Sequence, residues 1–211
     1  TTDDTLIRYR TPFFYGLITH ERDFMAVDRY VASHLTGARG PVRDVLEYLA
    51  LVTIYSNTGL PETLIKLLLG VAEDARFTLP ELFGEGPARL LAVRMGRVRL
   101  MHQVIAEEVL TDLTGGGKRD EWPFALHRLS MDMIKAITSL VGPDAQVVTD
   151  LFRQLFLDRI SGTQDELEDR RDFAPIIERI DSIDHSLGHQ VLKSLTDYCP
   201  REAHFWNHLG R

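Results

Sequence analysis

Cysteine is almost absent from the sequence, since Cys199 is the single one among 211 residues. One thiol cannot form an internal disulfide or build a multi-cysteine zinc site, and this usage is typical of a reducing interior. We therefore expect a cytoplasmic protein. Cys199 precedes a proline and has no histidine beside it in sequence, so we expect it to be buried or inert rather than a nucleophile.

Long apolar runs and positive charge are also scarce. No segment approaches the roughly 18 to 20 apolar residues that span a bilayer, and the start of the chain lacks the features of a signal peptide. The sequence thus predicts no membrane segment. The 24 basic and 31 acidic residues give a net charge of −7, which opposes non-specific binding to nucleic acid. The start without methionine and the end at Gly210-Arg211 suggest a piece of a longer polypeptide.

Catalytic motifs are missing as well. The glycine run at 115–117, followed by Lys118, superficially resembles a phosphate-binding loop. However, Asp112 stands where the first glycine of that motif belongs, and Arg119 replaces the serine or threonine after the lysine. We interpret the run as a linker. No nucleophile with a base and no carboxylate pair is recognisable, so these residues alone are predicted not to form an enzyme.

Two histidine pairs have the four-residue spacing of a helical zinc site, namely His185 with His189 and His204 with His208. The glutamate of the H-E-x-x-H motif is missing from both pairs. Gly188 weakens the first helix, and Phe205 inside the second pair is typical of packing. We interpret these histidines as structural and predict no metal site.

The chain is predicted to be mainly α and to have three segments, of which the second and third are separated by the glycine run. Residues 1–38 form a helical segment, with a helix from Thr19 to Leu35. Residues 39–114 form a winged-helix domain, helices with a small β-hairpin. Residues 120–211 form an α-helical bundle or the start of a solenoid, because apolar stripes at helical spacing follow one another.

The winged-helix prediction rests on the order of elements in the middle segment. A helix opening at Pro41 has almost no polar face and must lie at the centre of a core. A helix from Pro61 to Leu69 follows, then a hairpin of Arg89 to Arg94 and Arg97 to Met101. A last helix spans Gln103 to Leu113, with its apolar residues four apart.

A winged helix often binds DNA, but the charges here disfavour that function. Between residues 41 and 113, seven basic residues face ten acidic ones. The helix from Pro61 to Leu69 offers only Lys66 for contacts with bases and phosphates. Its aliphatic side chains are better explained by core packing, so we expect no nucleic-acid partner.

His102 lies at the junction between the second hairpin strand and the last helix of the winged-helix segment. There an imidazole N–H is able to donate to a phosphate oxygen that a neighbouring domain presents. Alternatively, the ring only bonds the local backbone and fixes the turn from strand to helix. The residue pattern leaves both interpretations open.

The triplet Met101-His102-Gln103 resembles the Met-His-Asp motif of STAND-class signalling NTPases, the NLR-like group that includes bacterial immune proteins. Here Gln103 replaces the aspartate. The segment from Thr11 to Leu17 also resembles the proline-containing lid of that class, and the 203–211 segment is similar to the start of a tetratricopeptide-like array in TIR- or sirtuin-fused relatives. The resemblance implies that residues 1–38 are the lid, that Pro12 packs on the nucleotide base and that His102 senses the β-phosphate of ADP.

By this resemblance, the chain is the regulatory part of an ADP/ATP-controlled switch. Its partners are an upstream NTPase domain of its own protein, a protein trigger bound by helical repeats and, after activation, further copies in a homo-oligomer. The isolated segment is expected to hold no cofactor. A winged-helix DNA-binding regulator and a non-catalytic protein-interaction scaffold remain the alternative functions.

Overall fold

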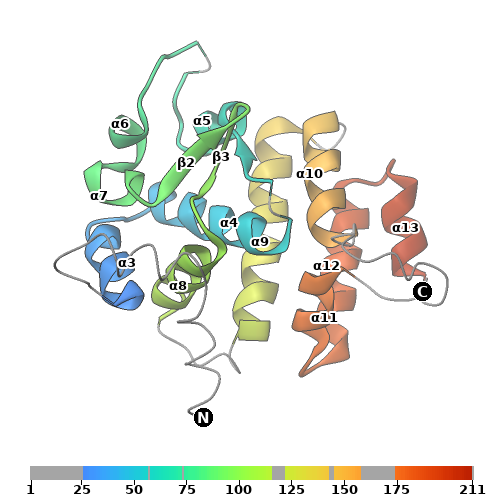
Figure 1. Ribbon diagram of the computed structural model, residues 1–211. Coiled ribbons are helices and arrows are strands. Elements are labelled where there is room, and N and C mark those ends of the chain that lie inside the picture. Colours follow the sequence, from blue (N-terminus) through green and yellow to red (C-terminus); the bar gives the residue numbers. More distant parts are fainter. Residues whose placement is uncertain are drawn as a thin grey trace.

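A computed structural model describes residues 26–56, 58–72, 74–115, 122–142, 145–157 and 174–210. Helices dominate, and a small antiparallel sheet is the other regular element (Figure 1). The predicted fold class, mainly α with a small β-hairpin, is therefore confirmed. The part of the 1–38 segment before Ala26, which includes Thr19 and Pro12, lies outside the described residues.

Helix α4 (Pro41–Tyr55) is the centre of the first half of the chain. Proline at its first position fits a helix start, where no backbone N–H is needed. Every residue from Val45 to Thr53 is buried, as the nearly continuous apolar sequence predicted. Helices α3 (Val27–Leu35) and α8 (Gln103–Leu113) pack against each other, and α8 also packs on α4.

The sheet has three strands in the order β1-β3-β2, one more than the predicted hairpin. Strands β2 (Leu91–Arg94) and β3 (Arg97–Leu100) form the hairpin, and β1 (Leu60–Pro61) pairs antiparallel with β3. Pro61 therefore belongs to a strand rather than to a helix. Helix α5 begins one residue later and spans Glu62–Leu68.

Two short helices precede the hairpin, α6 (Leu79–Phe83) and α7 (Glu85–Ala88), with Gly84 between them. Helix α5, these two short helices and the β2–β3 hairpin thus follow one another along the chain between α4 and α8.

The two short helices also pack in a way that limits what they can contact. Residues 79–88 contain two glutamates and no lysine or arginine. Helix α7 packs on α3 so closely that a Cβ added to Gly86 would lie 2.5 Å from the carbonyl oxygen of His34. The side of α7 at Gly86 is thus covered by α3.

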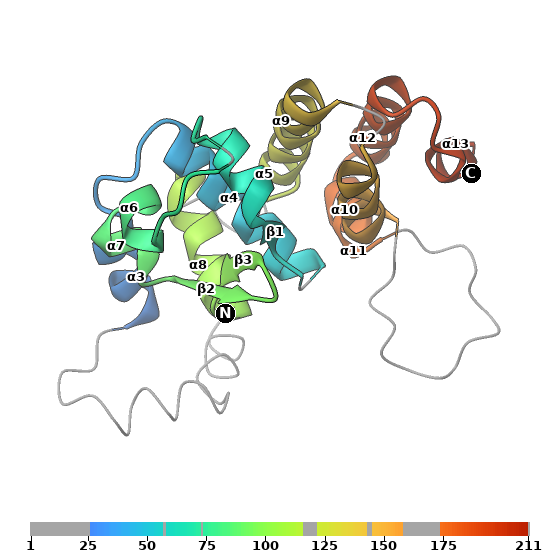
Figure 2. The ribbon, with the colours of Figure 1, turned by 90° about the horizontal axis from the view of Figure 1, so that it is seen from above.

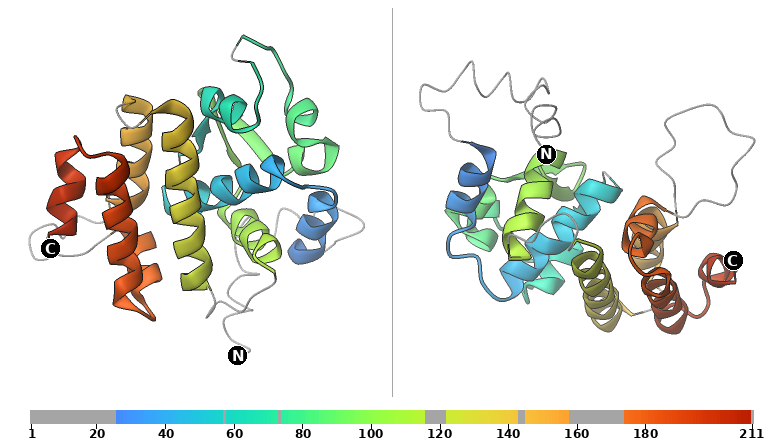
Figure 3. Two further views of the ribbon diagram at one scale, coloured as in Figure 1. Left: turned by 180° about the vertical axis from the view of Figure 1, so that it is seen from behind. Right: turned by 90° about the horizontal axis from the view of Figure 1, so that it is seen from below.

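The elements that the structure describes from residue 122 onward are all helices. They are α9 (Trp122–Val141), α10 (Gln146–Phe156), α11 (Pro175–Asp181), α12 (His185–Tyr198) and α13 (Ala203–Leu209). Helices α9 and α12 lie side by side, α10 and α11 follow one another along them, and α13 packs on the outer side of α12 (Figures 1 and 3). The predicted apolar stripe of α9 is buried from Leu126 to Ile137, whereas Leu140 is half exposed.

Helix α9 joins the two halves of the molecule. Seen from above, it lies between the elements of residues 27–113 and the remaining helices (Figure 2), and it contacts both α4 and α5. Buried apolar side chains form one continuous cluster that begins at Val27 and reaches Phe205 in α13. Among the described residues, no helix combines the length and apolar character needed to cross a membrane.

Candidate functional site at the start of α8

The start of α8 is held by the sheet that precedes it. Leu100, the last residue of β3, is fully buried, and the backbone N–H of Met101 donates to the carbonyl of Leu90 at 3.0 Å. The chain then remains extended at His102, with φ −152° and ψ 149°, and turns into the helix at Gln103. His102 is the N-cap residue, so its place in space is fixed by both strand and helix.

The imidazole of His102 caps the helix. Its Nδ1 accepts a hydrogen bond from the backbone N–H of Val104 at 3.1 Å, as an N-cap side chain does for the second residue of a helix. A ring nitrogen that accepts cannot carry a proton, so the neutral ring carries its proton on Nε2. The local backbone contact considered from the sequence is therefore present, and it leaves Nε2–H as the donor of the ring.

Two charged side chains act on His102. Partial burial lowers the pKa of the imidazole below its usual 6.5, the positive charge of Arg99 in β3 lowers it further, and Glu107 in α8 opposes both. The net shift is downward, so the ring is neutral near pH 7. The site thus offers a neutral donor beside a guanidinium.

The side chain of Gln103, which stands in place of the motif's aspartate, extends along α8 toward Glu107. Its side-chain amide lies 3.5 Å from Oε1 of Glu107, a long hydrogen bond one helical turn away. The carboxylate that acts on His102 is consequently that of Glu107, on the next turn of α8. No sequence motif singles out Glu107, because the known motif is a contiguous triplet.

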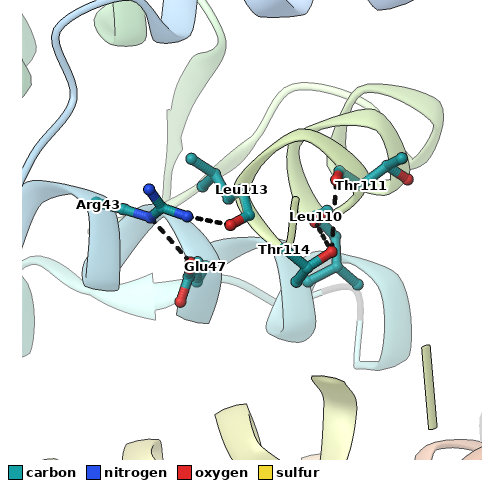
Figure 4. Close-up of polar contacts among 6 residues, drawn as sticks. All are labelled: Arg43, Glu47, Leu110, Thr111, Leu113 and Thr114. Atoms are coloured by element: carbon teal, nitrogen blue, oxygen red, sulfur yellow. Dashed lines mark hydrogen bonds and ion pairs between the residues drawn. The ribbon is translucent and has the colours of Figure 1, made fainter. Parts of the chain in front are cut away.

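The far end of α8 is fixed by a side chain from α4. The guanidinium of Arg43 donates through one terminal nitrogen to the carbonyl of Leu113 and through Nε to Glu47, at 3.3 Å (Figure 4). The hydroxyl of Thr114 donates to the carbonyl of Leu110 at 2.7 Å. The bond from Arg43 satisfies a carbonyl that the helix end leaves without a backbone partner, whereas the Leu110 carbonyl also accepts from the backbone N–H of Thr114.

Glu47 is a carboxylate inside the packed region, with a side chain that is 8 % exposed. Burial raises its pKa above the usual 4.5, although the hydrogen bond and charge of Arg43 and the charge of Arg128 in α9 lower it. The net direction means that loss of hydration outweighs these attractions. Arg43 and Glu47 thus form an anchor between α4 and the end of α8.

The remaining sequence-derived candidates lie apart from His102. Pro12 is outside the described residues. Cys199 is buried, as predicted. His185 and His189 are both exposed on α12, and within the described ranges no group of three or more histidine, cysteine, aspartate or glutamate side chains is arranged to hold a metal ion.

Comparison with known proteins gives no further assignment. No family model, no curated protein and no solved structure matches this chain.

Proposed function

We propose that this chain is the regulatory part of a STAND-type nucleotide-dependent switch in an immune-like defence protein. In this proposal, an NTPase domain outside these residues binds ADP, and His102 donates from Nε2–H to a β-phosphate oxygen. Pro12 contacts the base in the same closed state. Exchange of ADP for ATP breaks the histidine contact and releases the domains for assembly into a homo-oligomer.

The observation that carries the proposal is the position and protonation of His102. A ring whose Nδ1 accepts from Val104 presents a fixed N–H on its other side. The ring lies at the N-terminal end of an eleven-residue helix, where the helix dipole favours a negative charge. Arg99, close enough to lower the pKa of the ring, adds positive charge at the same place. These features suit a phosphate oxygen.

The energy of one such contact is sufficient for a switch. A hydrogen bond to a charged group is worth on the order of 1 to 3 kcal/mol. Only a contact that differs between the closed and open states shifts their populations. A phosphate contact made in the closed state alone would therefore change the closed-to-open ratio roughly five- to a hundred-fold.

The alternative function as a DNA-binding regulator is less well supported. In a DNA-binding winged helix, the helix before the hairpin contacts the bases. The two helices at that position here, α6 and α7, are separated by Gly84 and lack basic residues, and α7 packs on α3. Binding to DNA requires cations that neutralise phosphates, and affinity then falls steeply with salt. We expect no salt-dependent binding of this chain to duplex DNA.

The experiment compares two substitutions of His102 in a protein that also carries its nucleotide-binding domain. Asparagine preserves an N-cap acceptor but does not reach as far, whereas alanine removes both functions. We expect both His102→Asn and His102→Ala to accelerate ADP release and to raise oligomerisation without a trigger. Release of a fluorescent ADP analogue and light scattering measure these two quantities.

The control is the stability of each variant, which separates capping from phosphate binding. His102→Asn is expected to melt close to the wild-type temperature and still release ADP faster. If His102→Asn releases ADP at the wild-type rate, the histidine is only a helix cap. If ADP and ATP leave oligomerisation unchanged in the wild-type protein, the scaffold function replaces the switch.

A further inference from the structure

A cleft lies where the two halves of the molecule meet, between α4, α5 and α9. Its volume is about 330 Å³, near the lower end of the range for small-molecule sites. The apolar part of its wall includes Val45 from α4, Leu68 from α5 and Leu140 from α9. Leu140 is half exposed, so the apolar wall continues to the surface.

The polar part of the wall consists of Asp44 and Tyr48 from α4 and Ser139 from α9. Tyr48 is only 6 % exposed, yet its hydroxyl makes no hydrogen bond with any residue that the structure describes. Within the same described ranges, the carboxylate of Asp44 has no hydrogen-bond or ion-pair partner. The ring of Tyr48 is thus packed into the wall of the cleft, whereas its unpartnered hydroxyl is not sealed from solvent.

Negative charge surrounds this hydroxyl. Burial raises the pKa of Tyr48 to about 12, and the carboxylates of Asp44, Asp132 and Glu47 add to the effect. Glu47 is bonded to Arg43, and the charge of Arg128 acts on it as well. Asp44 and Asp132 are the carboxylates beside Tyr48 for which the described residues provide no bonded cation.

We propose that this cleft binds the side chain of a lysine or arginine that a protein partner presents. The aliphatic stem would pack against Val45, Leu68 and Leu140, and the charged group would donate to the Asp44 carboxylate and the Tyr48 hydroxyl. Long basic side chains combine these two properties, an apolar stem and a cationic end. A small inorganic cation would leave the apolar wall unused.

The position of the cleft gives such a contact a further effect. Its walls come from α4 and α5 on one side and from α9 on the other. A bound side chain therefore touches the winged-helix elements and the helical half at once. A partner would hold these two parts together through one residue.

Nuclear magnetic resonance titration of the 211-residue chain tests the proposal with capped amino acids. The probes are the N-acetyl methylamides of arginine and lysine, and the uncharged comparison is that of norleucine. We expect saturable shifts of backbone amides at residues 44–48 and 136–140, with millimolar dissociation constants for the two cationic probes. The norleucine compound is expected to bind at least fivefold more weakly.

Substitutions decide whether the named groups are responsible. Asp44→Asn and Tyr48→Phe change little volume, and each is expected to weaken the arginine probe at least fivefold. Asp28→Asn, an exposed change on α3 that alters the net charge equally, should leave binding unchanged. Equal binding of norleucine, unsaturable shifts spread over all surface carboxylates, or full binding by both cleft variants with wild-type circular dichroism would each overturn the proposal.

Discussion

Arg43, near the start of α4, donates a hydrogen bond to the backbone carbonyl of Leu113, the last residue of α8, seventy positions further along the chain. The same guanidinium bonds Glu47. One side chain thus donates to the last carbonyl of α8 and to a buried carboxylate. The contact fixes the C-terminal end of α8, the helix that begins at His102.

Replacement of Arg43 by methionine should destabilise the fold. The substitution keeps most of the apolar stem but leaves the Leu113 carbonyl and the Glu47 carboxylate without their donor. We expect a loss of about 1.5 to 3 kcal/mol in the free energy of unfolding, the range for hydrogen bonds to charged groups. Urea denaturation followed by circular dichroism measures it. Arg39→Met, at an exposed position, should change stability by less than about 0.5 kcal/mol.

Glu47→Gln should stabilise the protein at neutral pH. The pKa of Glu47 is raised in the folded state, so its charged form costs free energy there. The stability linked to a raised carboxyl pKa is present below the unfolded value of 4.5 and is lost as pH rises through the folded pKa. Glutamine avoids this loss and still accepts from Arg43.

The measurement for Glu47→Gln is the urea midpoint of both proteins between pH 4 and pH 8. The midpoint of the variant should exceed that of the wild-type protein at pH 7, and the advantage should shrink toward pH 4. A variant that is less stable at pH 7 would mean that attraction to Arg43 and Arg128 outweighs desolvation.

The sequence was sufficient for elements that depend on local pattern. The helix from Gln103 to Leu113 has the predicted bounds, because its apolar spacing, the glycine after it and the residue before it all act locally. The burial of α4 likewise followed from its composition. Strand β1 was missed, since it has two residues and its partners, Val98 and Arg97, lie more than thirty positions away.

The site was predictable only in part. His102 was singled out by a triplet, and its cap geometry was one of two interpretations that the sequence left open. Glu107 and Arg99 act on the ring because a strand and a helix bring them near it, which no contiguous motif records. The bond from Arg43 to Leu113 depends on packing between helices, and neither residue type is distinctive at its position.

Met95, at the tip of the β2–β3 hairpin, offers a gain in stability. Its φ is +52°, the left-handed region that side chains other than asparagine, aspartate and glycine rarely adopt, and its side chain is 91 % exposed. A two-residue turn of this kind favours asparagine before glycine. Met95→Asn should therefore raise the free energy of unfolding by about 0.5 to 1 kcal/mol.

Thermal unfolding of Met95→Asn and Met95→Leu separates backbone strain from the loss of an apolar side chain. Leucine keeps an apolar group in the same strained conformation and is expected to give no gain. If both variants melt at the wild-type temperature, the turn is not strained enough to matter. If both are less stable, Met95 contributes a contact that outweighs its strain.

The last prediction concerns the pH dependence of stability that His102 supplies. The folded pKa of this imidazole lies below its unfolded value of 6.5, so between these two values the unfolded chain binds more protons. The stability linked to His102 is then complete above pH 6.5 and is lost as pH falls through the folded pKa. Protonation also removes the acceptor that caps α8, since Nδ1 can no longer accept from Val104.

His102→Asn tests this mechanism because asparagine caps a helix and does not titrate. The wild-type protein should lose more stability than the variant between pH 7.5 and pH 5, whereas the two should be close at pH 7.5. His102→Ala should be less stable by about 0.5 to 2 kcal/mol at pH 7.5, the cost of losing an N-cap. Chemical denaturation of all three proteins across this range gives the comparison. Parallel pH profiles for the wild-type protein and His102→Asn would assign the acid sensitivity to other histidines, and the neutral cap at the start of α8 would lose its support.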